Sequence, residues 1–563
     1  MNIHFTEPRP GEMEMLAAGG FRWVRMDFDW IATEPERGRW DWRPYERLLA
    51  ALDRQRIRPL FILDYVHPLY DNAQSPHSED GIAAFARWAG AAARHFRGRG
   101  ILWEIYNEPN IVPFWRPTVN ARDYVRLAKA VCLAVRREAP GELLVGPATS
   151  GIDLPFLEEC FRAGLLNDWA AVTVHPYRQS EPETVLEEYR RLRLLIRRYA
   201  PPGKRIPILS GEWGYSAAWS GMDEERQARM LARQWLVNAL SGVPLSIWYD
   251  WRDDGLDPRE FEHHFGTVRH PYRGGLDPVY EPKPAYSAAR TLARFLRGCR
   301  FSKRLMAGPD DVFVLLFTGP GGPRLAAWTT ASAPRAVTIP AGPGRFTAQG
   351  HLGDAREPLE AGRGGLRLEL TGAPLLVAPV GRNAVLDAAA RWETAPLEIV
   401  VRGPAAVALP AGRGAAGRIP LVLRARIGRE AAPVRARALL APPAPGATPP
   451  PGTNWRALAG LVQETAVIAS NPLVLEALPL LPAPRPGAAA QLPVRIASPS
   501  GEGFRGVLAA RVAAGRTRLE RVAVRIAPGL REHVVRIPVP AAGELLAGGW
   551  LEDARALRLA VLA

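Results

Sequence analysis

The sequence predicts an α/β protein, a (β/α)8 barrel of the TIM type followed by two or three all-β sandwich domains. Residues 1 to about 297 alternate short apolar runs with amphipathic stretches, which is the pattern of parallel β/α units. Beyond them, apolar and polar residues alternate with a period of two between glycine- and proline-rich stretches, as in antiparallel sheets. A chain of 563 residues is also too long for a single core.

Eight apolar runs in the first part have the length and composition of strands. They are Asn2–Phe5, Arg22–Asp27, Pro59–Tyr65, Leu102–Asn107, Leu143–Gly146, Ala171–His175, Ile206–Gly211 and Leu245–Tyr249. The stretches between them follow the helical period, and the stretch after the fourth run carries on one face Tyr124, Leu127, Ala128, Val131 and Val135. When eight such units close into a barrel, the functional residues lie at the C-terminal ends of the strands.

The domain boundaries follow from the change in pattern. A helix expected over Tyr286–Leu296 ends the barrel domain, which we assign to residues 1–297. Residues 298–382 are expected to form a small antiparallel β-sandwich. Two immunoglobulin-like β domains are expected at residues 383–478 and 479–563, around proline-rich connections. No motif in these later domains suggests catalysis.

The fourth expected strand ends in Asn107-Glu108-Pro109. Pro109 cannot donate to a sheet ladder, so the strand must stop there. It also disfavours the helical region for Glu108 and directs that residue into an extended or turn conformation. A carboxylate and an amide are therefore held at the rim of the sheet, where we expect them to meet a ligand.

A second glutamate ends the seventh expected strand, about a hundred residues later, in the segment Ser210-Gly211-Glu212-Trp213-Gly214. Two carboxylates at the ends of separate strands are what a glycosidase needs. One carboxylate protonates the leaving oxygen, and the other attacks the anomeric carbon or activates water. Glu108 and Glu212 are therefore the candidate catalytic residues.

Taken together, these two motifs resemble those of clan A of the retaining glycoside hydrolases, with families 39 and 5 the most similar. The resemblance implies that Glu108 acts as general acid and then as general base, and that Glu212 is the nucleophile. It also implies that Asn107 hydrogen-bonds the sugar 2-hydroxyl. The implied substrate is a poly- or oligosaccharide. No metal or organic cofactor is implied, because this chemistry needs only carboxylates and water.

Further polar strand ends match positions that bind substrate or steady the nucleophile in the family. In the family, an arginine at the position of Arg25 keeps the nucleophile ionised. Arg25 could instead pair with Asp27 or Asp29. His175 and Tyr177 follow the sixth strand, where relatives place side chains that contact the nucleophile and the sugar. A structural role is the alternative for His175.

Three further residues, at or below the rim, could have structural roles. His67, after the third strand, is expected either to bind substrate or to anchor its loop. Trp248 ends the eighth strand, where family members stack a sugar ring on an indole face, and a packing tryptophan is the alternative. Glu104 should lie about 13 Å below the rim, since a strand advances about 3.3 Å per residue, so we expect an internal polar brace.

The bulk composition excludes several classes of protein. The net charge is +15, but it comes from arginine scattered along the chain rather than from a compact basic run interleaved with aromatic residues, so no nucleic-acid partner is expected. Attraction to an acidic polysaccharide is a weaker possibility. Cys132, Cys160 and Cys299 lack metal-ligand spacing and are expected to be buried free thiols. No apolar stretch is long enough to span a membrane.

Cellular location and the main rival function complete these expectations. Relatives that degrade polysaccharides are usually exported, whereas no charged-then-apolar leader precedes the first expected strand. We therefore expect a secreted or cell-surface protein whose leader is missing from this sequence, and we expect a monomer. The rival function is a non-catalytic carbohydrate-binding or scaffold protein on a barrel. The presence of both Glu108 and Glu212 argues against it, and hydrolysis of an aryl glycoside would decide.

Overall fold

The barrel of this computed structural model is built on one parallel sheet. The model describes residues 1–391 except 306, 340 and 363, and in the rest of the chain the strands that lie between residues 398 and 562. Seven parallel strands follow one another in sequence order: β1 (Trp23–Asp29), β2 (Arg58–Asp64), β3 (Leu102–Ile105), β4 (Leu143–Ser150), β5 (Ala171–His175), β6 (Ile208–Trp213) and β7 (Ser246–Trp248). Their order and direction confirm the predicted α/β barrel in outline.

The N-terminal residues occupy the place of the first expected strand. The backbone N–H of Asn2 donates to the carbonyl of Trp248 on β7 at 2.9 Å, and that of Ile3 donates to Arg25 on β1 at 3.0 Å. The two edges of the seven-stranded sheet are thus joined through this segment, and the sheet is nearly closed. The expected strand Asn2–Phe5 is itself reduced to a single bridge between Asn2 and Arg25, because the pairing stops after Ile3.

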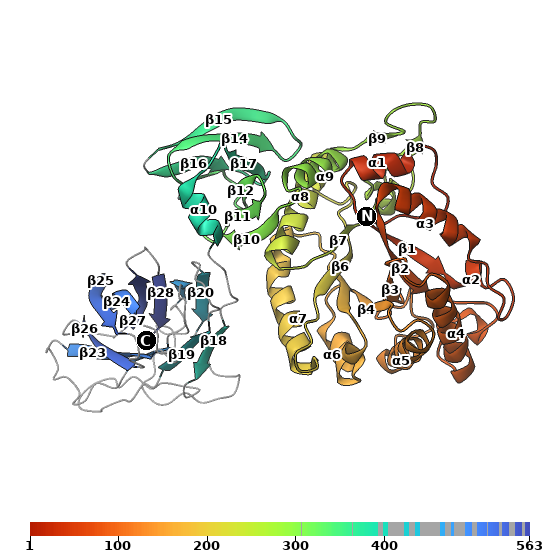
Figure 1. The fold of residues 1–563 in the computed structure, drawn as a ribbon, viewed down its shortest axis with the longest axis horizontal. Coiled ribbons are helices and arrows are strands. Elements are labelled where there is room, and N and C mark those ends of the chain that lie inside the picture. Colours follow the sequence, from red (N-terminus) through yellow and green to blue (C-terminus); the bar gives the residue numbers. More distant parts are fainter. Residues whose placement is uncertain are drawn as a thin grey trace.

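Helices surround the parallel strands (Figure 1). They are α1 (Glu12–Ala18), α2 (Trp30–Thr33), α3 (Arg43–Gln55), α4 (Glu79–His95), α5 (Ala121–Glu138), α6 (Leu154–Arg162), α7 (Val185–Tyr199), α8 (Glu224–Leu240) and α9 (Pro284–Phe295). Side chains cap several of them: Ser78 accepts from Gly81 N–H at the start of α4, and Asp223 accepts from Arg226 N–H at the start of α8. The apolar face expected on α5 is buried along its whole length.

Short elements complete the barrel domain. Four 3-10 helices lie in the loops: η1 (Asp71–Ala73), η2 (Leu165–Asn167), η3 (Pro182–Thr184) and η4 (Phe261–His264). An antiparallel pair, β8 (Val268–Tyr272) and β9 (Tyr280–Pro282), lies between β7 and α9. The η4 helix and the start of β8 belong to the connection that follows β7, and this connection contributes to the mouth of the barrel.

A second sheet follows α9 and is antiparallel, as predicted. Its strands are β10 (Arg300–Arg304), β11 (Val312–Gly319), β12 (Gly322–Thr329), β13 (Arg335–Ile339), β14 (Gly344–Gly350), β15 (Ala355–Gly362), β16 (Gly365–Leu370) and β17 (Leu375–Pro379). They form one eight-stranded sheet in the order β10-β11-β12-β17-β14-β15-β16-β13. The two-layered sandwich stays a prediction.

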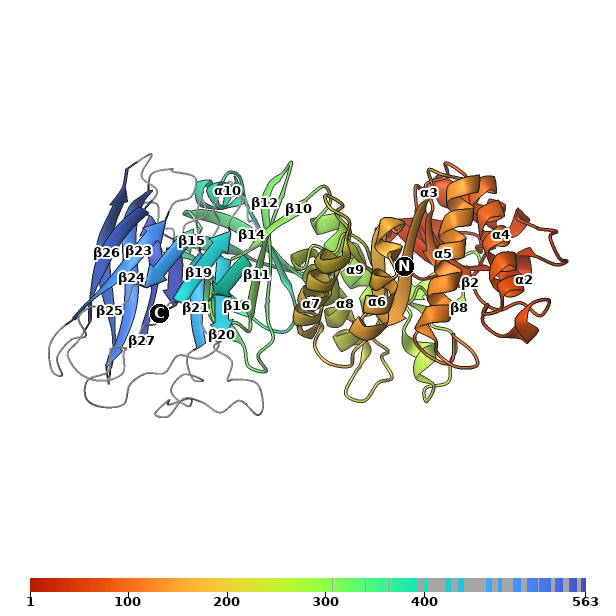
Figure 2. The same ribbon diagram turned by 90° about the horizontal axis from the view of Figure 1, so that it is seen from below.

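This sheet is joined to the barrel, next to α8 and α9 (Figure 2). The indole N–H of Trp328 on β12 donates to Oε1 of Glu183 at 2.6 Å, and Glu183 also pairs with Arg233 on α8. Helix α10 (Ala384–Arg391) packs on the same sheet, with Leu386 fully buried. The unit therefore extends past residue 382, where the sequence pattern placed its end.

The remaining strands are antiparallel β-structure. They are β18 (Glu398–Arg402), β19 (Leu421–Arg426), β20 (Val434–Leu439), β21 (Val462–Val467), β22 (Val474–Ala477), β23 (Ala490–Ala497), β24 (Phe504–Ala514), β25 (Arg516–Ile526), β26 (Glu532–Val539), β27 (Leu546–Asp553) and β28 (Arg558–Leu562). Strands β22 and β23 pair across the predicted boundary at 478/479. Two immunoglobulin-like domains thus remain a prediction, and the proline-rich connections lie outside the described residues.

Two sequence-based expectations concern thiols and membranes. Cys132 and Cys160 are buried free thiols, whereas Cys299 is half-buried. No helix in the described part of the chain combines the length and the hydropathy that crossing a membrane requires.

Candidate active site

Glu108 is held at the mouth of the barrel by an unusual backbone conformation. Strand β3 ends at Ile105, and Glu108 has a φ of 44°, in the left-handed region that non-glycine residues rarely adopt. Pro109 disfavours the right-handed helical region for its predecessor, and the N–H of Glu108 donates to the carbonyl of Ala148 at 3.0 Å. These constraints aim the carboxyl group at His175, whose Nδ1 lies 2.8 Å from Oε1 of Glu108.

Glu212 lies near the C-terminal end of β6, and both of its carboxylate oxygens have a donor. Nη1 of Arg25 donates to Oε2 at 2.5 Å, and the hydroxyl of Tyr177 donates to Oε1 at 2.8 Å. The side chain is 14% exposed. A cation and a hydroxyl therefore stabilise the ionised carboxylate, while an open side of the group still faces the mouth of the barrel.

The two glutamates come close together. One carboxylate oxygen of Glu108, one of Glu212 and one ring nitrogen of His175 all lie within 4.8 Å of one another. Carboxyl groups about 5–5.5 Å apart suit a covalent intermediate, whereas about 6.5–9.5 Å leaves room for a water between them. An oxygen of each carboxyl group within 4.8 Å of the other is close enough for the first arrangement.

Arg25 links Glu212 to two other side chains of the barrel interior. Besides binding Glu212, it donates from Nε to Glu104 at 2.6 Å and from Nη2 to Oδ1 of Asn107 at 2.7 Å. It is 1% exposed, so its guanidinium supports the neighbouring side chains and does not itself meet a ligand. The alternative partners Asp27 and Asp29 are not the ones it uses. Glu104 is the internal brace that the strand geometry predicted.

Burial sets the protonation of the groups around the pair. Burial raises the pKa of Glu108 to about 7, although the charge of Arg25 opposes this shift. Burial also lowers the pKa of His175 to about 4, so its ring is neutral at pH 7. Burial, together with the negative charge of Glu212, raises the pKa of Tyr177 well above its usual range, so its hydroxyl remains a donor. The site thus contains a buried carboxyl group with a raised pKa beside an ion-paired one.

Two candidate substrate contacts take the structural alternative that the sequence left open. Both ring nitrogens of His67 bind backbone, with Nε2 2.9 Å from the carbonyl of Glu34 and Nδ1 accepting from Leu69 N–H, so this residue anchors its loop. Trp248 has 0% exposure, and its indole N–H donates to the carbonyl of Phe265. Because no face of the indole is accessible, Trp248 packs in the core and offers no surface for sugar stacking.

His175 and Tyr177 were expected to contact the nucleophile and the sugar between them. Nδ1 of His175 contacts Glu108, and the ring is fully buried. Tyr177 is the residue that reaches Glu212. Asn107 precedes Glu108, and its carbonyl oxygen accepts from Arg25, which also binds Glu212. Arg25, Asn107, His175 and Tyr177 are thus brought together with the two glutamates.

The sequence interpretation missed a polar pair between the N-terminal segment and β7. Nε2 of His4 lies 3.5 Å from Oδ2 of Asp250, and the His4 ring also meets Tyr249 edge-on. Burial lowers the pKa of His4, but the bond and charge of Asp250 outweigh it and raise that pKa to about 9. Tyr249 in turn packs against Tyr177. The signal was the position of His4 and Asp250 at the C-terminal ends of the first and last expected strands.

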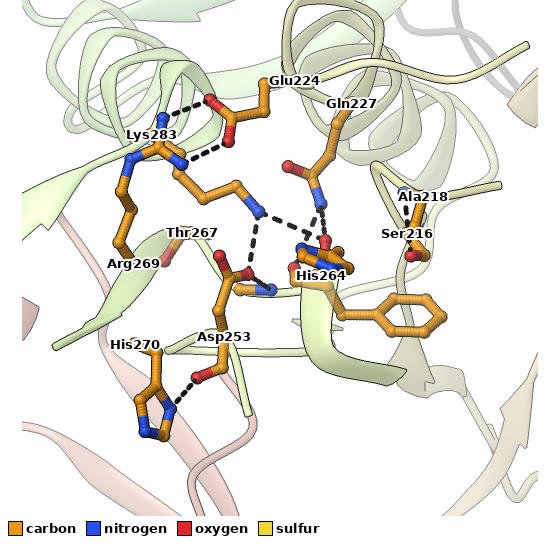
Figure 3. Close-up of polar contacts among 12 residues, drawn as sticks. Ser216, Ala218, Glu224, Gln227, Asp253, His264, Thr267, Arg269, His270 and Lys283 are labelled. Atoms are coloured by element: carbon orange, nitrogen blue, oxygen red, sulfur yellow. Dashed lines mark hydrogen bonds and ion pairs between the residues drawn. The ribbon is translucent and has the colours of Figure 1, made fainter. Parts of the chain in front are cut away.

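The connection after β7 is fastened by a buried network (Figure 3). The ammonium of Lys283 donates to Oδ1 of Asp253 at 2.8 Å and to the carbonyl of His264 at 3.2 Å, and Lys283 has no exposed side-chain surface. Gln227 of α8 donates to the same carbonyl at 2.9 Å. These contacts fix the segment that carries Asp250 and Phe265 against the barrel.

In the part of the chain that the structure describes, two groups of side chains have donor atoms close enough for a metal ion. They are Glu108, His175 and Glu212, and His4, Asp250 and Asp254. In the first group, both oxygens of Glu212 already accept hydrogen bonds, from Arg25 and from Tyr177. That arrangement suits a carboxylate nucleophile better than a metal ligand.

The fold is shared with solved glycoside hydrolases. A family 39 glycoside hydrolase from Bacteroides cellulosilyticus WH2 aligns with a TM-score of 0.59 at 23% identity, over 67% of this chain and 80% of that one. A monomeric β-xylosidase from Caulobacter crescentus CB15 aligns at 0.50 and 17% identity, over 68% and 96%. A glucosidase from Croceicoccus marinus aligns at 0.50 and 13% identity, over 68% and 95%. No protein-family model and no curated protein matches the sequence. By structure, the chain is similar to these enzymes in fold.

Proposed function

We propose that this protein is a retaining O-glycoside hydrolase that cleaves a poly- or oligosaccharide by double displacement. The observation that carries the proposal is a buried Glu108 with a raised pKa beside an ion-paired Glu212, with one oxygen of each carboxyl group within 4.8 Å of the other. The fold shared with solved glycoside hydrolases supports it. Glu108 is the general acid and base in this mechanism, and Glu212 is the nucleophile.

In the first step, a carboxylate oxygen of Glu212 attacks the anomeric carbon while the bond to the leaving oxygen breaks. The proton of Glu108 goes to that oxygen, so the leaving group departs as a neutral alcohol. Arg25 and Tyr177 hold Glu212 ionised and oriented for attack. Asn107 presents its amide N–H to the sugar 2-hydroxyl, since its carbonyl oxygen is held by Arg25.

In the second step, Glu108 acts as the base. The glycosyl ester has removed the negative charge of Glu212, and Glu108 takes a proton from water as that water attacks the anomeric carbon. Glu212 leaves as a carboxylate and is again met by Arg25 and Tyr177. Two inversions at one carbon leave the product with the configuration of the substrate.

The structural neighbours suggest the first substrates to try. They include a β-xylosidase and a glucosidase, so aryl β-xylosides and β-glucosides head the panel. We propose that the protein acts outside the cell or at its surface, because polymeric substrates do not enter cells. We also propose that it acts as a monomer. It requires no metal or organic cofactor in this mechanism.

The test uses both glutamates. Glu212→Ala should abolish turnover, and added azide or formate should restore some of it with product of inverted configuration. Glu108→Ala should still be glycosylated by substrates with good leaving groups, and azide should then give a glycosyl azide of retained configuration. Proton NMR of the products reports both outcomes. Identical behaviour of the two variants, inversion by the unaltered protein, or no hydrolysis of any glycoside would refute the proposal.

A further inference from the structure

The neutral ring of His175 has one nitrogen in contact with Glu108 and the other near Glu104. Nδ1 lies 2.8 Å from Oε1 of Glu108. Nε2 points to the other side, is fully buried, and has no hydrogen-bond partner among the described residues. Oε1 of Glu104 is also buried and unpartnered there, although its other oxygen binds Arg25. Two buried polar atoms thus await a partner in the same region.

Gly211 shows that these two atoms lie near one common point. A Cβ on Gly211 would lie 3.2 Å from Oε1 of Glu104 and 3.4 Å from Nε2 of His175. The two atoms are not in direct contact, and a movement of the two side chains toward each other would allow a direct hydrogen bond. Leaving either atom unpaired in the interior would cost about 1–3 kcal/mol, so a link between them is favoured.

The chemistry of Glu104 decides which nitrogen of His175 carries the proton. Glu104 is ion-paired with Arg25 at 2.6 Å and is therefore a carboxylate, which only accepts hydrogen bonds. In a direct bond, the nitrogen that faces it must then be the donor. A neutral imidazole has a single N–H, so the nitrogen that faces Glu108 must be an acceptor.

We propose that Glu104 is a positioning residue that holds His175 in the Nε2–H tautomer, so that Nδ1 accepts a hydrogen bond from the O–H of Glu108. The lone pair on Nδ1 favours a proton-bearing Glu108 and disfavours its carboxylate. The catalytic meaning of this inference rests on the proposed function. The hydrogen bond to Nδ1 keeps Glu108 protonated for the first step and makes its carboxylate a stronger base in the second. No net proton is gained or lost by the ring during turnover.

Other charged and titratable groups act on the same pair and are included in the test. The charge of Arg25 on β1 lowers the pKa of Glu108 and also that of His175. The charge of Glu212 on β6 raises the pKa of His175. Tyr177 and Glu262 on neighbouring loops also interact with Glu108. Glu104→Gln also removes a charge that pairs with Arg25, so a shift in the titration of Glu108 is assigned to the Glu104–His175 link only if Gly211→Ala, which keeps that charge, shifts it in the same direction.

The direct measurement is the tautomer. In ¹⁵N-histidine NMR of the full chain, the signals of His175 are those that disappear in the His175→Gln variant. Its Nε2 should have the chemical shift of a protonated nitrogen, and its Nδ1 that of an unprotonated nitrogen. In Glu104→Gln, the amide oxygen replaces the acceptor for Arg25, and the amide N–H turns toward His175. The proton should then move to Nδ1. An Nδ1–H tautomer in the unaltered protein would overturn the inference.

The kinetic measurement is the alkaline limb of kcat/KM for an aryl glycoside with a poor leaving group. With Nδ1–H donating to it, the carboxylate of Glu108 is stabilised, so Glu104→Gln should move this limb to lower pH by about 1 unit. Gly211→Ala should act in the same direction, because its Cβ separates Glu104 from His175 without changing any charge. The φ of Gly211 is not positive, so alanine is compatible with the backbone.

The matched control is Glu183→Gln. Glu183 also forms a buried ion pair with an arginine, Arg233, and the substitution removes the same charge from a pair that does not touch the two catalytic glutamates. It should lower Tm and leave the alkaline limb in place. If Glu104→Gln and Glu183→Gln change Tm alike and neither moves the limb or the tautomer, Glu104 is only structural. If no glycoside is hydrolysed at all, the proposed function fails, and the NMR spectrum still decides the tautomer.

Discussion

Arg25 and Glu212 are 187 residues apart in the chain, yet Nη1 of Arg25 lies 2.5 Å from Oε2 of Glu212. Strand β1 supplies the cation and strand β6 the carboxylate, and the guanidinium is itself held by Glu104 and Asn107. The charge of the proposed nucleophile is thus matched by a cation that is fixed before any substrate arrives. Such preorganisation costs no rearrangement during the reaction.

The first prediction concerns the pH dependence of activity. Burial raises the pKa of Glu108 to about 7, so the group carries its proton below that pH and loses it above. For a phenyl glycoside, kcat/KM should be level below about pH 7 and fall about tenfold per unit above it. A flat profile through this range would contradict the role of Glu108 as acid. For substrates with good leaving groups, the rate of the first step should fall less above pH 7, because such leaving groups need little protonation.

The same shift predicts a pH dependence of stability. The folded state binds the proton of Glu108 more tightly than the unfolded state does, because the folded pKa is about 7 against an ordinary value of 4.5. Its contribution to stability is therefore fully present below about pH 4.5 and is lost as pH rises through about 7. Glu108→Gln should lack this component, so the difference in Tm between variant and unaltered protein should widen in favour of the variant from pH 4 to pH 8.

The second prediction concerns Tyr177. Tyr177→Phe removes the O–H that donates to Glu212 at 2.8 Å but keeps the ring. A hydrogen bond to a charged group contributes about 1.5–3 kcal/mol, so kcat/KM should fall by about 10- to 150-fold with little change in Tm. Tyr215→Phe is the control, since the hydroxyl of Tyr215 donates to a backbone carbonyl outside the site. Equal losses of activity in both variants would argue against a specific role for Tyr177.

The third prediction separates packing from sugar stacking at Trp248. This side chain is fully buried, so Trp248→Ala should lower the free energy of unfolding by about 3–5 kcal/mol, and Trp248→Phe by less. Urea unfolding measures both effects. An alanine variant that keeps its stability and loses only affinity for the substrate would restore the sugar-stacking interpretation.

The fourth prediction concerns the fastening of the connection after β7. Lys283 and Asp253 form a buried ion pair at 2.8 Å (Figure 3). Lys283→Met leaves the carboxylate of Asp253 buried without its cation, and this should cost about 3–5 kcal/mol of stability. Adding Asp253→Asn should recover part of the loss, because the uncompensated charge is then gone.

The control for the fourth prediction is an exposed ion pair. Arg190 pairs with Glu187 on the surface of α7, so Arg190→Met should change stability by less than about 1 kcal/mol. If Lys283→Met costs no more than this, the buried pair does not fasten the connection. Activity should fall with Lys283→Met only as far as the segment carrying Asp250 is displaced.

The sequence by itself determined the parallel β/α order, the strand ends and the two glutamates. Period-two and helical patterns locate strands and helices, and Pro109 ends a strand beside Glu108 for local steric reasons. The expected brace at Glu104 followed from counting residues along that same strand. Each of these inferences depends on neighbours in the chain, which a sequence displays directly.

Only the tertiary structure decided which side chains meet. His175 hydrogen-bonds Glu108, and His67 and Trp248 are buried and bound to backbone carbonyls. Strand pattern shows that a residue lies at the rim, but the tilt of the strands and the packing of the connections between them set its partner and its exposure. Those depend on contacts between segments far apart in the chain, and for that reason the burial of Trp248 could not be predicted from its position in a strand.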